Sequence, residues 1–447
     1  MPPSKISAAD TVETRTLYTS PMPPQSIRHR TCCAAIFGAV LSLALAVSAD
    51  AADWALIHAR IYPSPDAVPI ADGTILIHQG RIAAIADGAL RVPDDARRVD
   101  LHGGTVMAGF WNSHVHLISP PLLNAGKHAD AELTRELTQM LSRWGFTTVF
   151  DIASLLKNTN VIRQRVASGQ VIGPTILTVG DPFYPKGGTP IYVRQFMKDN
   201  GFPDEEVLNL AEAVARAHRQ FHEGADGMKL FAGAIVGGEI GVLPMPLEQA
   251  RALVEAAHAD GKPVFAHPSN LAGLTVSMDS GVDVLAHTTP MTGPWSADLT
   301  ARILAHHMAL IPTLTLFEVE AKKFGESDQE LKKDMDAAVQ QVGTYSKAGG
   351  QILFGTDVGY IDAYDTAEEY RLLGRALDWH QILKALTTAP AERFGYAVRK
   401  GRLARGMDAD FVVLDGDPSK DVTAFARVRL TVRAGRTIYD ANTQPAN

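Results

Sequence analysis

Short apolar runs alternate with amphipathic helical patterns over residues 107–394, and this alternation constrains the fold more than any other feature of the chain. Such alternation is typical of βα units, in which crossover helices join parallel strands. Eight apolar runs qualify as strands, so the pattern predicts a (β/α)8 barrel whose functional side chains lie at the carboxyl ends of the strands. The predicted strands are Val106–Leu117, Thr147–Ile152, Thr175–Val179, Gly227–Phe231, Pro263–His267, Val282–His287, Ala309–Leu314 and Gln351–Asp357.

Start and stop signals mark two of the intervening helices. One is expected over residues 204–224 with Asp204 as its N-terminal cap, and the other over residues 246–261. Segments 181–203 and 232–245 follow the third and fourth strands and are rich in turn-forming residues. Long loops on the catalytic face usually carry function, so we expect both segments to wall a substrate site.

Period-two patterns with turn signals occur on both sides of this region, in residues 50–106 and 395–447. Neither segment is long enough to bury both faces of a sheet alone. The simplest arrangement packs both into one small β-sandwich domain. The predicted fold class is therefore α/β, a (β/α)8 TIM barrel over residues 107–394 with a β-sandwich formed from both chain ends.

The first 49 residues differ in composition from the rest of the chain. A lead rich in Pro, Ser and Thr is followed by Arg28-His29-Arg30, an apolar run and then small residues at positions 48–52. This order is typical of a secretory signal peptide. The run is shorter than the roughly 20 apolar residues of a membrane-spanning helix. We expect a disordered lead and signal peptide over residues 1–49, an exported mature protein, periplasmic or secreted, and no membrane span after cleavage. An uncleaved N-terminal anchor is the alternative.

Composition excludes two classes of function. The formal charge of −7 is mild and no basic patch occurs, so nucleic acid is not an expected partner. Both cysteines, Cys32 and Cys33, lie within the predicted signal. The mature chain would therefore have neither a disulfide framework nor a thiol nucleophile.

His114 and His116 end the first predicted strand and are separated by one residue. In an extended backbone their side chains point the same way, so both can reach one metal ion. Closure of a barrel brings the ends of the other strands to the same mouth. Four imidazoles and a carboxylate in one place suit zinc or a similar divalent ion. The further residues at strand ends are Lys229, His267, His287 and Asp357.

Lys229 ends the fourth strand and has two interpretations. An ammonium group has donors only and cannot ligate a cation, so the lysine can stay charged and neutralise a carboxylate. Alternatively it loses its proton and reacts with CO2, which gives a carbamate able to bridge two metal ions.

These motifs, in this order, resemble the amidohydrolase superfamily, and within it the imidazolonepropionase-like and prolidase-like members that carry a lysine on strand four. The resemblance covers about residues 53–440. The motifs that carry it are His-Val-His at 114–116, Met-Lys-Leu at 228–230, Ala-His-Pro at 266–268, Leu-Ala-His at 285–287 and Gly-Thr-Asp at 355–357.

The resemblance implies a binuclear centre with two divalent metal ions, of which Zn2+ is the expected identity. His114, His116 and Asp357 would hold one ion, His267 and His287 the other, and N6-carboxylated Lys229 would bridge both. It implies hydrolysis of an amide, dipeptide or cyclic amide C–N bond by a hydroxide that bridges the ions. Asp357 would act as general base and then general acid.

Two other functions stay open at this point. One is a mononuclear deaminase or imidazolone-type ring hydrolase, and the other is a non-catalytic barrel that serves as a scaffold. The expected partner is a small-molecule amide or peptide, and a homo-oligomer is compatible with the sequence. Relatives often carry a Gly-Gly-His after strand three, where this chain has Lys186-Gly187-Gly188-Thr189-Pro190. Substrate-binding residues are therefore not transferred; Tyr192 and Arg194 either grip a substrate carboxylate or belong to a solvated loop.

Overall fold

The computed structural model describes residues 54–203 and 205–443. The predicted signal peptide over residues 1–49 and the predicted helix cap Asp204 lie outside these ranges. Among the helices of the described ranges, none is long and apolar enough to cross a membrane.

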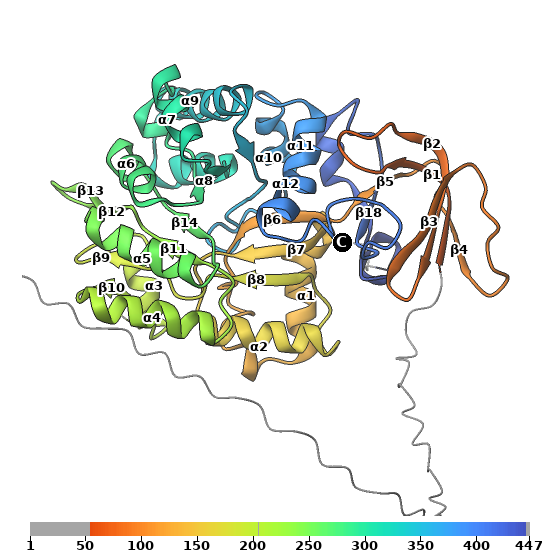
Figure 1. The fold of residues 1–447 in the computed structure, drawn as a ribbon, viewed down its shortest axis with the longest axis horizontal. Coiled ribbons are helices and arrows are strands. Elements are labelled where there is room, and N and C mark those ends of the chain that lie inside the picture. The colour runs from red at the N-terminus through yellow and green to blue at the C-terminus, as the bar shows by residue number, and fades with distance from the viewer. Residues whose placement is uncertain (1–53, 204, 444–447) are drawn as a thin grey trace, which may run out of the picture. The chain divides into compact units, whose positions relative to one another are not determined.

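Strands from both ends of the chain form one eight-stranded sheet in the order β20-β19-β18-β5-β1-β2-β3, with β4 paired to β1. Figure 1 shows β18, in blue, beside β5, in orange, and these two strands are antiparallel. The predicted joining of both ends is therefore present. The strands are β1 (Trp54–Tyr62), β2 (Ile70–His78), β3 (Arg81–Asp87), β4 (Arg97–Asp100), β5 (Thr105–Ala108), β18 (Phe411–Leu414), β19 (Val428–Arg433) and β20 (Arg436–Asp440).

Hydrogen bonds connect all strands of this small β domain, whereas a sandwich of two separate sheets would have no such bonds between its layers. β1 pairs with β2 on one side, and on the other its first half pairs with β4 and its second half with β5. Between the halves, His58 adopts a positive φ of 53°. All strands of the domain therefore belong to one hydrogen-bonded sheet, in which β1 changes partner along its length, and the packing of this sheet into a sandwich stays a prediction.

Eight further strands lie in two parallel sheets, β6-β7-β8 and β11-β14-β15-β16-β17. Backbone hydrogen bonds link the sheets at both edges. At one edge Ser113 N–H donates to Phe354 O at 2.8 Å, and at the other Phe183 N–H donates to Lys229 O at 2.9 Å. The strands are β6 (Phe110–Val115), β7 (Phe146–Asp151), β8 (Thr175–Thr178), β11 (Met228–Leu230), β14 (Val264–Ala266), β15 (Val284–Ala286), β16 (Ala309–Ile311) and β17 (Gln351–Ile352).

The predicted first strand, Val106–Leu117, is wrong as a single element. It consists of β5, which belongs to the small β domain, and β6, which pairs with β7. Gly109 separates the two strands, and a Cβ atom there would collide with the side chain of Thr147 on β7. The chain therefore changes sheets at a point where only glycine fits.

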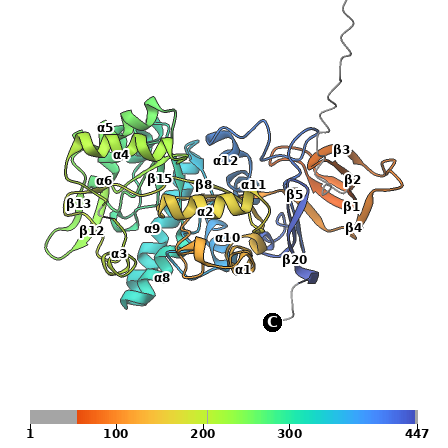
Figure 2. The same ribbon diagram turned by 90° about the horizontal axis from the view of Figure 1, so that it is seen from below.

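Helices follow most of the parallel strands. The predicted helix over 246–261 is present as α5, whereas the one predicted from residue 204 begins later. Glu206–Val207 is the short strand β10, and the Asn209 side chain caps α4 by accepting from Glu212 N–H. α4 and α5 pack side by side (Figure 2). The helices are α1 (Asp130–Met140), α2 (Leu156–Ala167), α3 (Arg194–Asp199), α4 (Leu210–His222), α5 (Leu247–Ala259), α6 (Leu271–Ser280), α7 (Ala297–Ala305), α8 (Leu314–Phe324), α9 (Asp328–Lys347), α10 (Ala367–Leu373), α11 (Trp379–Leu386) and α12 (Thr388–Arg393).

The two segments predicted as loops contain secondary structure. Residues 232–245 include an antiparallel hairpin, β12 (Gly233–Gly237) with β13 (Gly241–Pro244). Segment 181–203 contains the short strand β9 (Tyr184–Pro185) and α3. Both segments follow parallel strands at their carboxyl ends, where they contribute to the cavity described below.

Aromatic rings fill the space between the parallel strands. Phe150 lies 4.8 Å from Phe265 between ring centres, and Trp111 stacks on Phe394 at 6.1 Å. Trp111, Phe150 and Phe265 are almost fully buried. Because the interior is packed, a ligand can enter only at the ends of the strands.

Candidate metal centre

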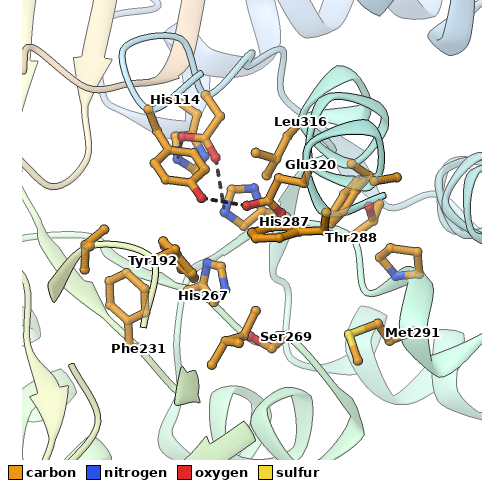
Figure 3. Close-up of a pocket in the computed structure, with 18 of the residues that line it drawn as sticks. His114, Tyr192, Phe231, His267, Ser269, His287, Thr288, Met291, Leu316 and Glu320 are labelled. Atoms are coloured by element: carbon orange, nitrogen blue, oxygen red, sulfur yellow. Dashed lines mark hydrogen bonds and ion pairs between the residues drawn. The ribbon is translucent and has the colours of Figure 1, made fainter. Parts of the chain in front are cut away.

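All six residues singled out in the sequence line one cavity of about 300 Å³. His114 lies in β6, Lys229 in β11, and His116, His267 and His287 directly follow β6, β14 and β15. Asp357 follows β17 after four residues. Figure 3 shows His114, His267 and His287 directed into this cavity. Parallel strands bring these side chains together because their carboxyl ends meet at one edge.

Three atoms converge most closely. Nε2 of His114 lies 3.3 Å from Nε2 of His116 and 3.2 Å from Oδ1 of Asp357, and His116 Nε2 lies 2.8 Å from the same Oδ1. Ligands on a tetrahedral zinc ion, with bonds of about 2.0–2.1 Å, stand about 3.3–3.4 Å apart. The spacing of the three atoms therefore fits a shared divalent cation.

Backbone geometry brings Asp357 to the two histidines. Asp357 has a positive φ of 61°, and its N–H donates to the carbonyl oxygen of His114 at 2.9 Å. His116 N–H donates in turn to Val358 O at 2.8 Å. These bonds fasten the segment after β17 to the end of β6, so the carboxylate and the imidazoles are held by neighbouring backbone.

Hydrogen bonds at Nδ1 orient two of the imidazoles. His116 Nδ1 lies 3.1 Å from Ala153 O, and a carbonyl accepts only, so Nδ1 carries the proton. His287 Nδ1 lies 2.6 Å from the hydroxyl of Thr313, which itself donates to Pro312 O. Nδ1 of His287 is therefore also the donor. In both rings the lone pair of Nε2 is left for a ligand.

His267 and His287 form the other side of the site. Their ring centres lie 4.8 Å apart, and His287 lies 4.6 Å from His114. His287 Nε2 is 3.6 Å from Oδ2 of Asp357, the oxygen that does not face the His114–His116 pair. His267 stacks on Phe231, over whose ring Lys229 Nζ also lies, 5.7 Å from the centre. Asp357 thus faces histidines on both sides.

Burial sets the charge state of these groups. It lowers the pKa of His114 and His267 to about 3 and that of His287 well below its usual value, so these imidazoles are neutral. Burial also lowers the pKa of Lys229 to about 7. For Asp357 burial acts the other way, but His114 and His116 hold the pKa of the carboxyl well below its usual value. Neutral imidazoles and an ionised carboxylate are the forms that bind a metal ion.

Two cavity residues, Glu320 and Tyr360, had no signal in the sequence. Tyr360 donates from its hydroxyl to Oε1 of Glu320 at 2.6 Å, and the ring of Tyr192 lies 5.3 Å from that of Tyr360. Glu320 sits on α8, where an isolated glutamate resembles any residue of a solvated helix face. Tyr192 lines the cavity, whereas Arg194 is exposed and donates from Nε to Thr189 O. Gripping of a carboxylate by the Tyr192–Arg194 pair is therefore not supported.

Comparison with known proteins places this geometry in a family. Residues 105–438 match the model of the amidohydrolase family. Ochratoxinase from Aspergillus niger is 23% identical over 420 residues, with 85% of this chain and 84% of that protein covered.

Two solved structures share the fold at low identity. One is a Xaa-Pro dipeptidase with bound methionine, with a TM-score of 0.74, 20% identity, and 87% of this chain and 100% of that chain covered. The other is molinate hydrolase, with a TM-score of 0.71, 20% identity, and coverage of 89% and 97%. The family match extends over most of the described residues and includes all six strand-end residues. The chain therefore belongs to the amidohydrolase family, and it is a hydrolase that acts on carbon–nitrogen bonds.

Proposed function

We propose that this protein is a binuclear metal-dependent amidohydrolase that cleaves an amide, dipeptide or cyclic amide bond. The observation that carries the proposal is the convergence of ligand atoms of His114, His116 and Asp357 within 3.3 Å of one another, beside His267 and His287. The two parallel sheets, with strands in chain order and hydrogen bonds at both edges, support a (β/α)8 barrel as the scaffold.

The donor set fits two cations. His114, His116 and Asp357 would hold the first ion, and His267 and His287 the second. Lys229, whose pKa burial lowers to about 7, has a neutral amine available at physiological pH, which supports its carboxylation and a bridging role. When bound, two divalent ions supply a water molecule of lowered pKa and polarise the scissile carbonyl.

Asp357 is the residue that moves the proton. Its two carboxylate oxygens face opposite histidines, so one can accept a proton from the attacking water. The C–O bond forms, the C–N bond breaks, and the same carboxyl then delivers the proton to the departing amine. The apolar walls of the cavity exclude bulk water during this exchange.

The names of similar proteins support a small-molecule substrate. They include a Xaa-Pro dipeptidase and molinate hydrolase, two enzymes with unlike substrates on one fold. Since the fold alone does not set specificity, the cavity walls decide the substrate. We also propose export of the mature chain, which the signal-like pattern at residues 28–52 supports and which N-terminal sequencing of the processed protein would test.

Substitution of Asp357 by Asn tests the assigned role. The amide keeps the size of the side chain but cannot accept the proton, so kcat should fall by roughly 10²–10⁴-fold while the circular dichroism spectrum stays unchanged. Undiminished turnover would refute the role of Asp357.

Metal content separates the binuclear enzyme from the mononuclear alternative. The binuclear enzyme should contain two ions per chain by elemental analysis, and 13C NMR after growth with labelled bicarbonate should show a carbamate that Lys229→Ala removes. One ion and no carbamate would favour the deaminase or ring-hydrolase interpretation instead.

A further inference from the structure

The walls of the cavity beyond the metal centre are largely apolar. Helix α8 contributes Leu316, Phe317 and Phe324, and Met291, which follows β15, lines the same cavity. Met291 and Phe324 are 69% and 63% exposed, which is unusual for large apolar side chains. They form an apolar rim at the entrance, which suits a ligand with a bulky apolar part.

The charged groups of the same walls are nearly all acidic. Glu320, Glu326 and Asp334 line the cavity in addition to Asp357. Among the described residues of the lining, Lys229 is the sole lysine and arginine is absent. Lys229 belongs to the proposed metal centre, where its Nζ lies 5.7 Å from the centre of the Phe231 ring and interacts electrostatically with Asp357. A substrate carboxylate would therefore find no arginine or second lysine in the walls to pair with.

A hydrogen bond from Tyr360 holds the side chain of Glu320 in place within the cavity. Tyr360 donates a hydrogen bond to Oε1 of Glu320, and Tyr360 N–H donates to Asp357 O at 3.2 Å. The glutamate is thus tied through one tyrosine to the backbone of the proposed catalytic residue. Figure 3 shows its carboxylate directed into the cavity, with Leu316 one turn earlier on the same face of α8.

We propose that Glu320 determines specificity by binding a protonated amine of the substrate, so that the enzyme favours amides with an apolar body and a cationic end and rejects those with a free carboxylate. The inference rests on the proposed hydrolase function and deepens it. An ammonium group would replace its lost hydration with a charge-assisted hydrogen bond to Glu320. A carboxylate in the same place would be desolvated beside the Glu320 anion, which is unfavourable, and Lys323, whose Nζ lies 6.0 Å from the centre of the Tyr360 ring, does not line the cavity.

A binding experiment tests the charge preference without catalysis. The probes are 4-phenylbutylamine, which is protonated at pH 7, and its neutral counterpart 4-phenylbutanol, titrated into zinc-loaded protein by calorimetry. A charged hydrogen bond in a partly buried site should make the amine bind roughly tenfold or more tightly. Glu320→Gln should abolish this preference. Glu318→Gln is the matched control, because Glu318 is on the same helix, pairs with Lys322 and does not line the cavity.

A substrate series tests the consequence for turnover. Leucyl-phenylalanine amide, its N-acetyl derivative and N-acetyl-leucyl-phenylalanine share one peptide bond and carry a positive, zero and negative charge. We expect kcat/KM to fall in that order, by roughly tenfold a step, and Glu320→Lys to reverse the order.

The outcomes separate this inference from the hydrolase proposal. Equal binding of amine and alcohol, or a preference that survives in Glu320→Gln, overturns the role of Glu320 even if the amides are cleaved. An amine preference that depends on Glu320 upholds the inference. If no amide is hydrolysed by zinc-loaded protein with that preference intact, the proposed cleavage of amide or peptide substrates is what fails.

Discussion

At the scale of single residues, the orientation of two of the four imidazoles depends on a partner that no ligand motif contains. His287 donates from Nδ1 to the hydroxyl of Thr313, and Thr313 has a positive φ of 47°. His116 uses Ala153 O in the same way, and Ala153 also has a positive φ. Residues with such backbone angles cost roughly 1–3 kcal/mol each and cluster at functional sites. Here they supply the acceptors that fix the ligand nitrogens.

Replacement of Thr313 by Val tests this dependence. Valine keeps the branched shape of the side chain, but Nδ1 of His287 loses its acceptor. Affinity for the second metal ion should fall roughly 10–100-fold, measured by competition with a chelator of known affinity. Thr275→Val is the control, since Thr275 bonds only within α6. Equal affinities in both variants would show that Thr313 does not position His287.

The sequence located the six strand-end residues because each ends an apolar run, and parallel strands bring such ends together. It did not locate Thr313, Glu320 or Tyr360. A hydroxyl that orients a ligand, or a glutamate on a helix after the seventh strand, becomes significant only through the residues it contacts. No spacing rule encodes these contacts, which join residues 26 positions apart for Thr313 and His287 and 40 for Tyr360 and Glu320.

At the scale of elements, helix α8 begins with a cap supplied by another helix. Thr313 precedes α8 without capping it through its side chain. Instead, the carboxylate of Glu369 on α10 accepts from the N–H groups of Leu314 and Thr315 and from the Thr315 hydroxyl. This contact ties two helices together and holds the element that carries Glu320.

Glu369 should make stability depend on pH. Burial raises the pKa of its carboxyl from 4.5 to about 7, so the folded protein binds this proton more strongly than the unfolded chain. The contribution of Glu369 to the free energy of unfolding is most favourable below about pH 4.5. As the pH rises to about 7 this contribution is lost, which lowers the free energy of unfolding by about 3 kcal/mol at most. In urea denaturation between pH 5 and 8, the free energy of unfolding should decline less with rising pH in Glu369→Gln than in the parent protein. Glu255→Gln, on the exposed face of α5, should follow the parent protein.

Element boundaries were predicted less well than element types. Periodicity does not reveal which sheet a strand joins, so β5 and β6 read as one run until their partners are known. Likewise, the two glutamates after Asp204 resemble a first helical turn, although Glu206 pairs through its backbone with Tyr184 in β9. In both cases tertiary pairing overrides a local signal.

At the scale of the whole molecule, the proposed metal ions should contribute to global stability. Ions that bind the folded state alone stabilise it by mass action. Removal with a chelator should therefore lower Tm by roughly 5–10 °C, and added zinc should restore it. Differential scanning fluorimetry measures both steps. His116→Ala should show most of this decrease in Tm before any chelator is added. An unchanged Tm in the metal-free parent protein would argue against a contribution of the ions to stability.

The pairing of β5 with β18 has a consequence for biosynthesis. Thr105 and Leu414 are direct partners in this sheet, although more than three hundred residues separate them. While the nascent chain is still being translated, β5 has an unpaired edge of the kind that recruits other polypeptides. Messages truncated before the codon for Phe411 should therefore yield insoluble product, whatever the state of the parallel strands already made.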